Sequence, residues 1–88
     1  RYLATQDQLW RAAVSVVCNI GEAQGRGSDG YLMQFYRYAL GSVFEVKSCL
    51  LICSEPVPEE LHKLVDSLIG NICKTIKATA ERRKDRLG

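Results

Sequence analysis

Five polar residues recur along the first part of this chain at a spacing that a helix brings onto one face. They are separated by four, four, three and four positions, and we call them the polar ladder: Arg11, Ser15, Asn19, Glu22 and Arg26. The residues between them are mostly apolar, which predicts a largely buried helix with a partly buried ladder. An unsatisfied buried polar group costs about 1–3 kcal/mol, so the ladder requires partners. Another helix, another subunit or a ligand could supply them.

The overall composition is typical of one small all-α domain, spanning residues 1–88. Of the 88 residues, 47% are hydrophobic and 2 are prolines. A core of this size often depends on oligomerisation. No apolar run approaches the ~20 residues that a membrane span needs, and no signal-peptide pattern occurs. We therefore expect a cytoplasmic protein without membrane contact.

Hydrophobic periodicity predicts three helices, over residues 5–24, 31–53 and 58–83. Thr5 and Gln8 fit a capping box at the start of the first helix. The middle helix carries two apolar stripes, which predicts that it contacts more than one neighbour. The predicted core stripes are Leu9, Ala13, Val16, Ile20 and Ala23 in the first helix, Leu32, Tyr36, Ala39, Val43, Val46, Leu50 and Cys53, flanked by Phe35, Leu40, Phe44 and Leu51, in the second, and Leu61, Val65, Leu68, Ile72, Ile76 and Thr79 in the third. Short connectors make neighbouring helices antiparallel, so we expect an up-down helical bundle. Glycines interrupt all three helices and are predicted to mark close helix crossings, at Gly21, Gly41 and Gly70.

The cysteines predict no cofactor. Four are present, none in a C-x-x-C pair, and each lies in or beside an apolar stripe. We interpret them as buried free thiols in a reducing cytoplasm. Cys49 and Cys53 share a helix face and could hold a metal. With His62 as the single histidine, however, a complete zinc site within one subunit would need an unusual ligand set.

Two segments resemble a known family. Arg-Ala-Ala-Val-Ser-Val at residues 11–16, followed by Asn19-Ile20-Gly21-Glu22, resembles the signature R-A-A-x-S-x-x-x-N-I-A-E-G. That signature belongs to bacterial four-helix-bundle proteins first known from intervening sequences in large-subunit ribosomal RNA genes. Residues 35–42 with Glu45 resemble the family's F-x-x-x-A-x-G-S-x-x-E stretch. This chain departs from the signature at two positions, because Gly21 replaces the usual Ala and Ala23 the usual Gly.

The resemblance implies a four-helix bundle that assembles into a ring, typically a pentamer, with no known enzymatic activity. Relatives include accessory proteins of diversity-generating retroelements, which bind a reverse transcriptase and nucleic acid. Family members carry another helix before the Arg-Ala-Ala segment, for which this chain has room only for a stub. We therefore expect the first helix to be missing or truncated here. Three explanations for the missing helix stay open: the chain is a fragment, upstream residues are absent, or a neighbouring subunit fills the gap.

The family pattern marks residues that we interpret as a structural polar network or subunit contact: Arg11, Ser15, Asn19, Glu22, Ser42 and Glu45. Ligand contact and catalysis are the alternatives. No nucleophile–base pair is evident, so we predict no catalytic residue and no enzyme. Small helical nucleases of the HEPN type place an Arg four to six residues before a His, and no such Arg precedes His62. We hypothesise that Glu22 and Glu45 accept hydrogen bonds from Arg11 or Arg26 across helices.

Positive charge gathers at the end of the chain. Residues 81–88, predicted as a basic tail, carry by themselves a net charge equal to the whole chain's +2. Favourable charge at a helix C-terminus or a solvated tail would explain this, and a phosphate-binding patch is the functional alternative. Our nucleic-acid-binding candidates are Arg26, Lys74, Lys77, Arg82, Arg83, Lys84 and Arg86. The favoured function is a non-enzymatic, ring-forming helical protein that binds RNA, DNA or a nucleic-acid enzyme such as a reverse transcriptase. A protein–protein scaffold without nucleic-acid contact is the alternative.

Overall fold

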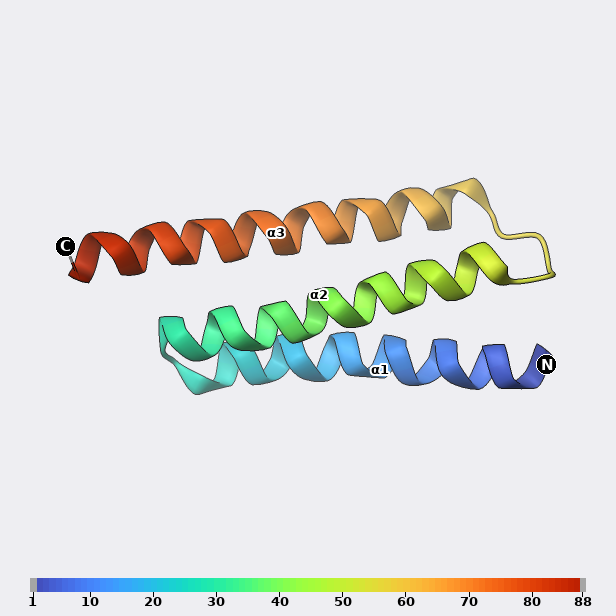
Figure 1. Ribbon diagram of the computed structural model, residues 1–88, viewed down its shortest axis with the longest axis horizontal. Coiled ribbons are helices and arrows are strands. Elements are labelled where there is room, and N and C mark those ends of the chain that lie inside the picture. The colour runs from blue at the N-terminus through green and yellow to red at the C-terminus, as the bar shows by residue number, and fades with distance from the viewer. Residues whose placement is uncertain (1, 88) are drawn as a thin grey trace.

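Three long helices make up the protein: α1 (Tyr2–Arg26), α2 (Asp29–Ile52) and α3 (Glu59–Leu87). The computed structural model describes residues 2–87, and side chains from residue 5 onward. Successive helices run in opposite directions, and α2 lies between the other two (Figure 1). Within the described residues, α1 and α3 each pack against α2, and neither contacts the other. The predicted all-helical fold is confirmed with three helices, and the four-helix bundle stays a prediction.

The core runs along α2, as its two apolar stripes predict. Tyr36, Ala39 and Val43 are buried there, and side chains of α1 and α3 close over them from either side. Val16 and Ala23 come from α1, and Val65, Ile72 and the polar Thr79 from α3. Every one of these residues belongs to a stripe that repeats by three and four, so helical periodicity predicted the core.

The turn between α1 and α2 shows why this segment breaks the helix. Gly27 has a φ of +76°, a left-handed conformation that glycine adopts without a steric penalty. Ser28 then caps α2, because its Oγ accepts a hydrogen bond from the Tyr31 backbone N–H at 3.3 Å. Pro58 immediately precedes α3, and its carbonyl accepts from the N–H groups of Leu61 and His62. These contacts set the residues at which α2 and α3 begin.

Two helix ends differ from the sequence prediction. α1 already begins at Tyr2, so Thr5 lies inside the helix rather than at its N-cap. α3 continues to Leu87, so the basic residues predicted as a tail form its last two turns instead. Figure 1 shows α3 extending past the start of α2. The basic side chains there are consequently ordered on a helix surface, and the final Gly88 lies outside the described residues.

The glycine prediction was wrong for this chain. A Cβ atom added at Gly21, Gly41 or Gly70 would meet nothing within 4 Å, so none of them marks a close crossing between these helices. All three lie on exposed helix faces. None of the described helices is long and apolar enough to cross a membrane.

Candidate nucleic-acid interface

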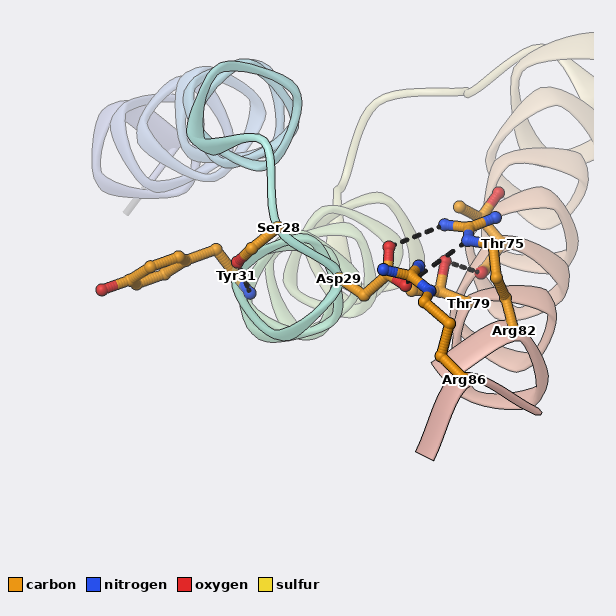
Figure 2. Close-up of polar contacts among 7 residues, drawn as sticks. All are labelled: Ser28, Asp29, Tyr31, Thr75, Thr79, Arg82 and Arg86. Carbon is orange, nitrogen blue, oxygen red and sulfur yellow. Dashed lines mark hydrogen bonds and ion pairs between the residues drawn. The ribbon is translucent and has the colours of Figure 1, made fainter. Parts of the chain in front are cut away.

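An ion-pair cluster joins the start of α2 to the end of α3. Asp29, the first residue of α2, accepts a hydrogen bond on Oδ1 from Nη2 of Arg82 at 3.1 Å. Arg86, one turn further along α3, donates to Oδ2 of the same carboxylate. Figure 2 shows both guanidinium groups reaching from α3 toward Asp29, while Tyr31 points away on the opposite side of α2. We call Arg82 and Arg86 the arginine fork.

A third arginine lies beside this fork. The Arg83 guanidinium would be 3.7 Å from a Cβ placed on Gly30, so it rests against the first turn of α2. A hollow of about 320 Å³ at this end is lined by Ser28, Asp29, Gly30, Arg83, Arg86 and Leu87. Arg83 has no carboxylate partner among the described residues. Positive charge therefore exceeds negative charge in this hollow.

The ion pairs of Asp29 were not predicted from the sequence. Asp29 is separated from Arg82 by 53 positions, so no local pattern connects them. One signal was available: in an antiparallel arrangement the start of α2 lies near the end of α3, where the arginines gather. Thr79 lies one turn before Arg82 and Arg83 on α3. Its buried Oγ1 donates to the Thr75 carbonyl at 2.8 Å, so this polar atom is satisfied within the helix (Figure 2).

The candidate lysines lie on a different side of α3 from the arginine fork. Lys74, Lys77 and Lys84 follow at spacings of three and seven, which a helix places on one exposed side. That side faces away from the buried Val65 and Ile72. None of the three lysines has an ion-pair partner in residues 5–87. The basic end of α3 therefore presents an unpaired lysine side and an arginine fork that is already engaged.

Arg26 lies apart from both groups, in an aromatic cluster beside the α1–α2 turn. Its guanidinium stacks over the rings of Tyr31 and Phe35, 5.2 and 5.4 Å from their centroids. It also pairs with Glu22 one turn earlier on α1, at 3.1 Å. Phe35 in turn packs edge-on against Tyr38. These contacts hold Arg26 at the turn, so it is not part of the basic surface of α3.

The middle of the polar ladder forms a hydrogen-bond network between α1 and α2. Ser15 Oγ on α1 lies 2.7 Å from Ser42 Oγ on α2, within hydrogen-bonding distance. Asn19 Nδ2 donates to both the Ser15 carbonyl and the Ser15 hydroxyl. The side chain of Ser42 is buried, and every buried polar side-chain atom in the described residues has a partner. This part of the ladder therefore ties α1 to α2.

The charged members of the ladder pair within α1 instead of across helices. Arg11 donates to Asp7, and Glu22 accepts from Arg26, each one turn apart. Glu45 on α2 has no partner among residues 5–87, but it shares a hollow of about 430 Å³ with Asp7, Arg11 and Ser15. The cross-helix hydrogen bonds that we hypothesised for Glu22 and Glu45 are thus not formed within this chain.

One side of α1 is apolar and uncovered. Trp10 is 69% exposed and Val17 is 71% exposed, and with Ala13, Val14 and Cys18 they line a wholly apolar depression. We call these five residues the α1 apolar side. The expectation that this helix is mostly buried was therefore wrong for the isolated chain, because only one of its two apolar sides contacts α2.

The thiols are less buried than predicted. Cys49 is buried and Cys53 partly so, but Cys18 and Cys73 are exposed, and all four are free. No group of three or more His, Cys, Asp or Glu side chains in the described part of the chain could hold a metal ion.

Comparison with known proteins places these features in a family. The family model described as 23S rRNA-intervening sequence protein matches residues 2–78, which is most of the chain. The chain belongs to this family. No curated protein and no solved structure matches it. The 23S rRNA-intervening sequence match spans the whole polar ladder and the lysines of α3 up to Lys77, but it ends before the arginine fork.

Proposed function

We propose that this protein is a non-enzymatic helical protein that assembles into a ring and binds nucleic acid through the basic end of α3. Membership of the 23S rRNA-intervening sequence family supports a role without catalysis. The observation that carries nucleic-acid binding is the lysine side of α3, where Lys74, Lys77 and Lys84 are exposed without carboxylate partners among residues 5–87. Unpaired lysines on one side of a helix are suited to nonspecific phosphate contacts.

Assembly is proposed from the α1 apolar side. A small monomer that leaves a tryptophan and two valines uncovered gains free energy by burying them, at about 25 cal/mol per Å² of apolar surface. Glu45 lines one hollow with Arg11, which is paired with Asp7, and a neighbouring subunit would supply the partner that Glu45 lacks among residues 5–87. A ring, pentameric as the resemblance implies, repeats the basic end of α3 in every subunit. Repetition raises the affinity for a polyanion well above that of one chain at +2.

Fluorescence anisotropy with a hairpin RNA and a duplex DNA, over a salt series, tests the binding proposal. Affinity should fall steeply with salt, because phosphate contacts release counterions. Replacing Lys74, Lys77 and Lys84 by Gln should weaken binding and flatten the salt slope by up to about 0.9 per lost contact on duplex DNA. The control replaces Arg37, an exposed cation on α2, by Gln, and it should change both quantities less than replacement of any one of the three lysines.

A protein–protein scaffold is the second candidate, and the extent of exposed apolar surface favours it. Leu51, Ile52 and Leu64 are exposed in addition to the α1 apolar side. A protein partner, such as a nucleic-acid enzyme, could cover them. Absence of binding to both nucleic acids at low salt would contradict the first proposal and leave the scaffold function.

A further inference from the structure

The arginine fork already holds an anion, and that anion belongs to the protein itself. Arg82 and Arg86 stand one turn apart on the same face of α3, and both donate to the Asp29 carboxylate. The Asp29 side chain is 14% exposed, whereas those of Arg82 and Arg86 are 52% and 62% exposed. Guanidinium groups recognise carboxylates and phosphates with the same donor geometry. A phosphate oxygen pair would therefore fit where the two oxygens of Asp29 now lie.

The charges around this carboxylate exceed what Asp29 can neutralise. Two guanidinium groups, those of Arg82 and Arg86, bind the Asp29 carboxylate, and the guanidinium of Arg83 lies against the neighbouring Gly30. Arg83 reaches the same hollow without a carboxylate partner among the described residues. The hollow thus keeps a net positive charge with Asp29 in place, and its outer side is open to solvent through the exposed arginines.

Stability alone does not require this arrangement. Asp29 is already favoured at the positive end of the α2 dipole without any arginine. The two cations are half exposed or more, so water screens part of their attraction to Asp29. Asp29 is therefore an internal competitor that an external phosphate of equal charge can replace.

We propose that Arg82, Arg83 and Arg86 form a phosphate-binding site for the nucleic-acid backbone, and that Asp29 occupies this site until nucleic acid displaces it. The inference rests on the proposed nucleic-acid binding but concerns different residues from the lysine side. It makes Asp29 an internal inhibitor, whose removal strengthens binding instead of weakening it.

The test compares the affinity of Asp29→Asn with that of the unchanged protein for the same fluorescent hairpin RNA. Asn keeps the size of the side chain but releases the two arginines. Two freed phosphate contacts should tighten Kd by about tenfold at low salt and steepen the salt slope by about 1.5. Asp85→Asn is the matched control. It removes one negative charge from the exposed surface of the same helix end, where Asp85 has no partner within residues 5–87. It should therefore tighten binding much less.

A second comparison assigns the effect to the arginines. In a background with Arg82→Gln and Arg86→Gln, Asp29→Asn should no longer tighten binding, since no fork remains to be released. An equal gain from Asp29→Asn and Asp85→Asn overturns the proposal, and so does a gain that persists in the fork-deleted background. If the unchanged protein binds through its lysines in either of these cases, the proposed function stands and only this inference fails.

The experiment also distinguishes the case in which this inference holds and the proposed function fails. Binding by Asp29→Asn but not by the unchanged protein supports the masked site and contradicts nucleic-acid binding by the free protein. Absence of binding by every variant overturns both. Circular dichroism melting reports whether Asp29→Asn folds. If it does not, the Nε–Hε NMR signals of Arg82 and Arg86 in the unchanged protein decide: a shift on adding the hairpin RNA supports displacement, and unchanged signals at saturation overturn it.

Discussion

Ser15 on α1 and Ser42 on α2 place their hydroxyl oxygens 2.7 Å apart, across the line where the two helices meet. Asn19 adds a hydrogen bond to the Ser15 hydroxyl from the same helix. A hydroxyl pair between helices fixes their relative register, because the buried Ser42 hydroxyl would lose its partner if one helix slid along the other. The pair therefore contributes to the specificity of the α1–α2 packing as well as to its stability.

Replacing Ser42 by Ala should lower the free energy of unfolding by about 1 kcal/mol. The change removes the partner of the Ser15 hydroxyl, and one intramolecular hydrogen bond contributes about 0.5–1.5 kcal/mol. Urea unfolding followed by circular dichroism measures the difference. Ser48→Ala, at an exposed position of the same helix, is the control and should change stability by less than about 0.5 kcal/mol. Equal effects of the two substitutions would show that the hydroxyl pair contributes nothing.

Two glycines at the turn between α1 and α2 should change stability in opposite directions when each is replaced by Ala. Gly25 is helical and a Cβ there would meet nothing within 4 Å, so Gly25→Ala should stabilise the protein by up to about 1 kcal/mol. Gly27 has a left-handed backbone, so Gly27→Ala should destabilise it by about 1–2 kcal/mol. Thermal melting of both variants measures this, and a shift of the melting temperature in the same direction would contradict the geometry of the turn.

Sequence periodicity was sufficient for the core and insufficient for the contacts between helix ends. Tyr36, Ala39 and Val43 are buried as predicted, because the three-and-four repeat of a helix directly determines which face can be apolar. The pairing of Asp29 with Arg82 depends on how far α3 runs past the start of α2. Helix length and overhang are properties of the whole fold, and no local pattern contains them.

The exposure of Trp10 was not predictable for a different reason. Its apolar neighbours indicate burial, but among the described residues α1 packs against α2 alone. Gly41 shows the same limit, since a Cβ there would meet nothing within 4 Å among the described residues. Sequence patterns report that a face is suited to burial, and they do not state whether the covering element is in the same chain.

The ion pair between Lys47 on α2 and Asp66 on α3 should contribute little. Lys47 Nζ lies 2.9 Å from Asp66 Oδ1, but both side chains are well exposed. Exposed pairs of this kind typically contribute about 0.2–1 kcal/mol and are screened by salt. A double-mutant cycle with Lys47→Gln and Asp66→Asn, measured by urea unfolding, should give a coupling in this range that decreases with added salt. A larger, salt-independent coupling would mean that the pair is desolvated in solution.

The single tryptophan offers a direct test of the proposed assembly. Trp10 is exposed in the isolated chain, so its emission in dilute solution should resemble that of free indole in water. If the α1 apolar side is a subunit interface, the emission maximum should shift to shorter wavelength as protein concentration rises. The mass from light scattering should increase over the same range.

Val17→Asp should abolish both changes, because an unpaired carboxylate on the apolar side costs more than the interface gains. Leu64→Ser, which alters an exposed leucine on α3, should leave both unchanged. Emission that stays at long wavelength while the mass rises would place the interface elsewhere on the molecule. A monomeric mass at every concentration would contradict ring formation, and would leave the α1 apolar side for a different protein partner.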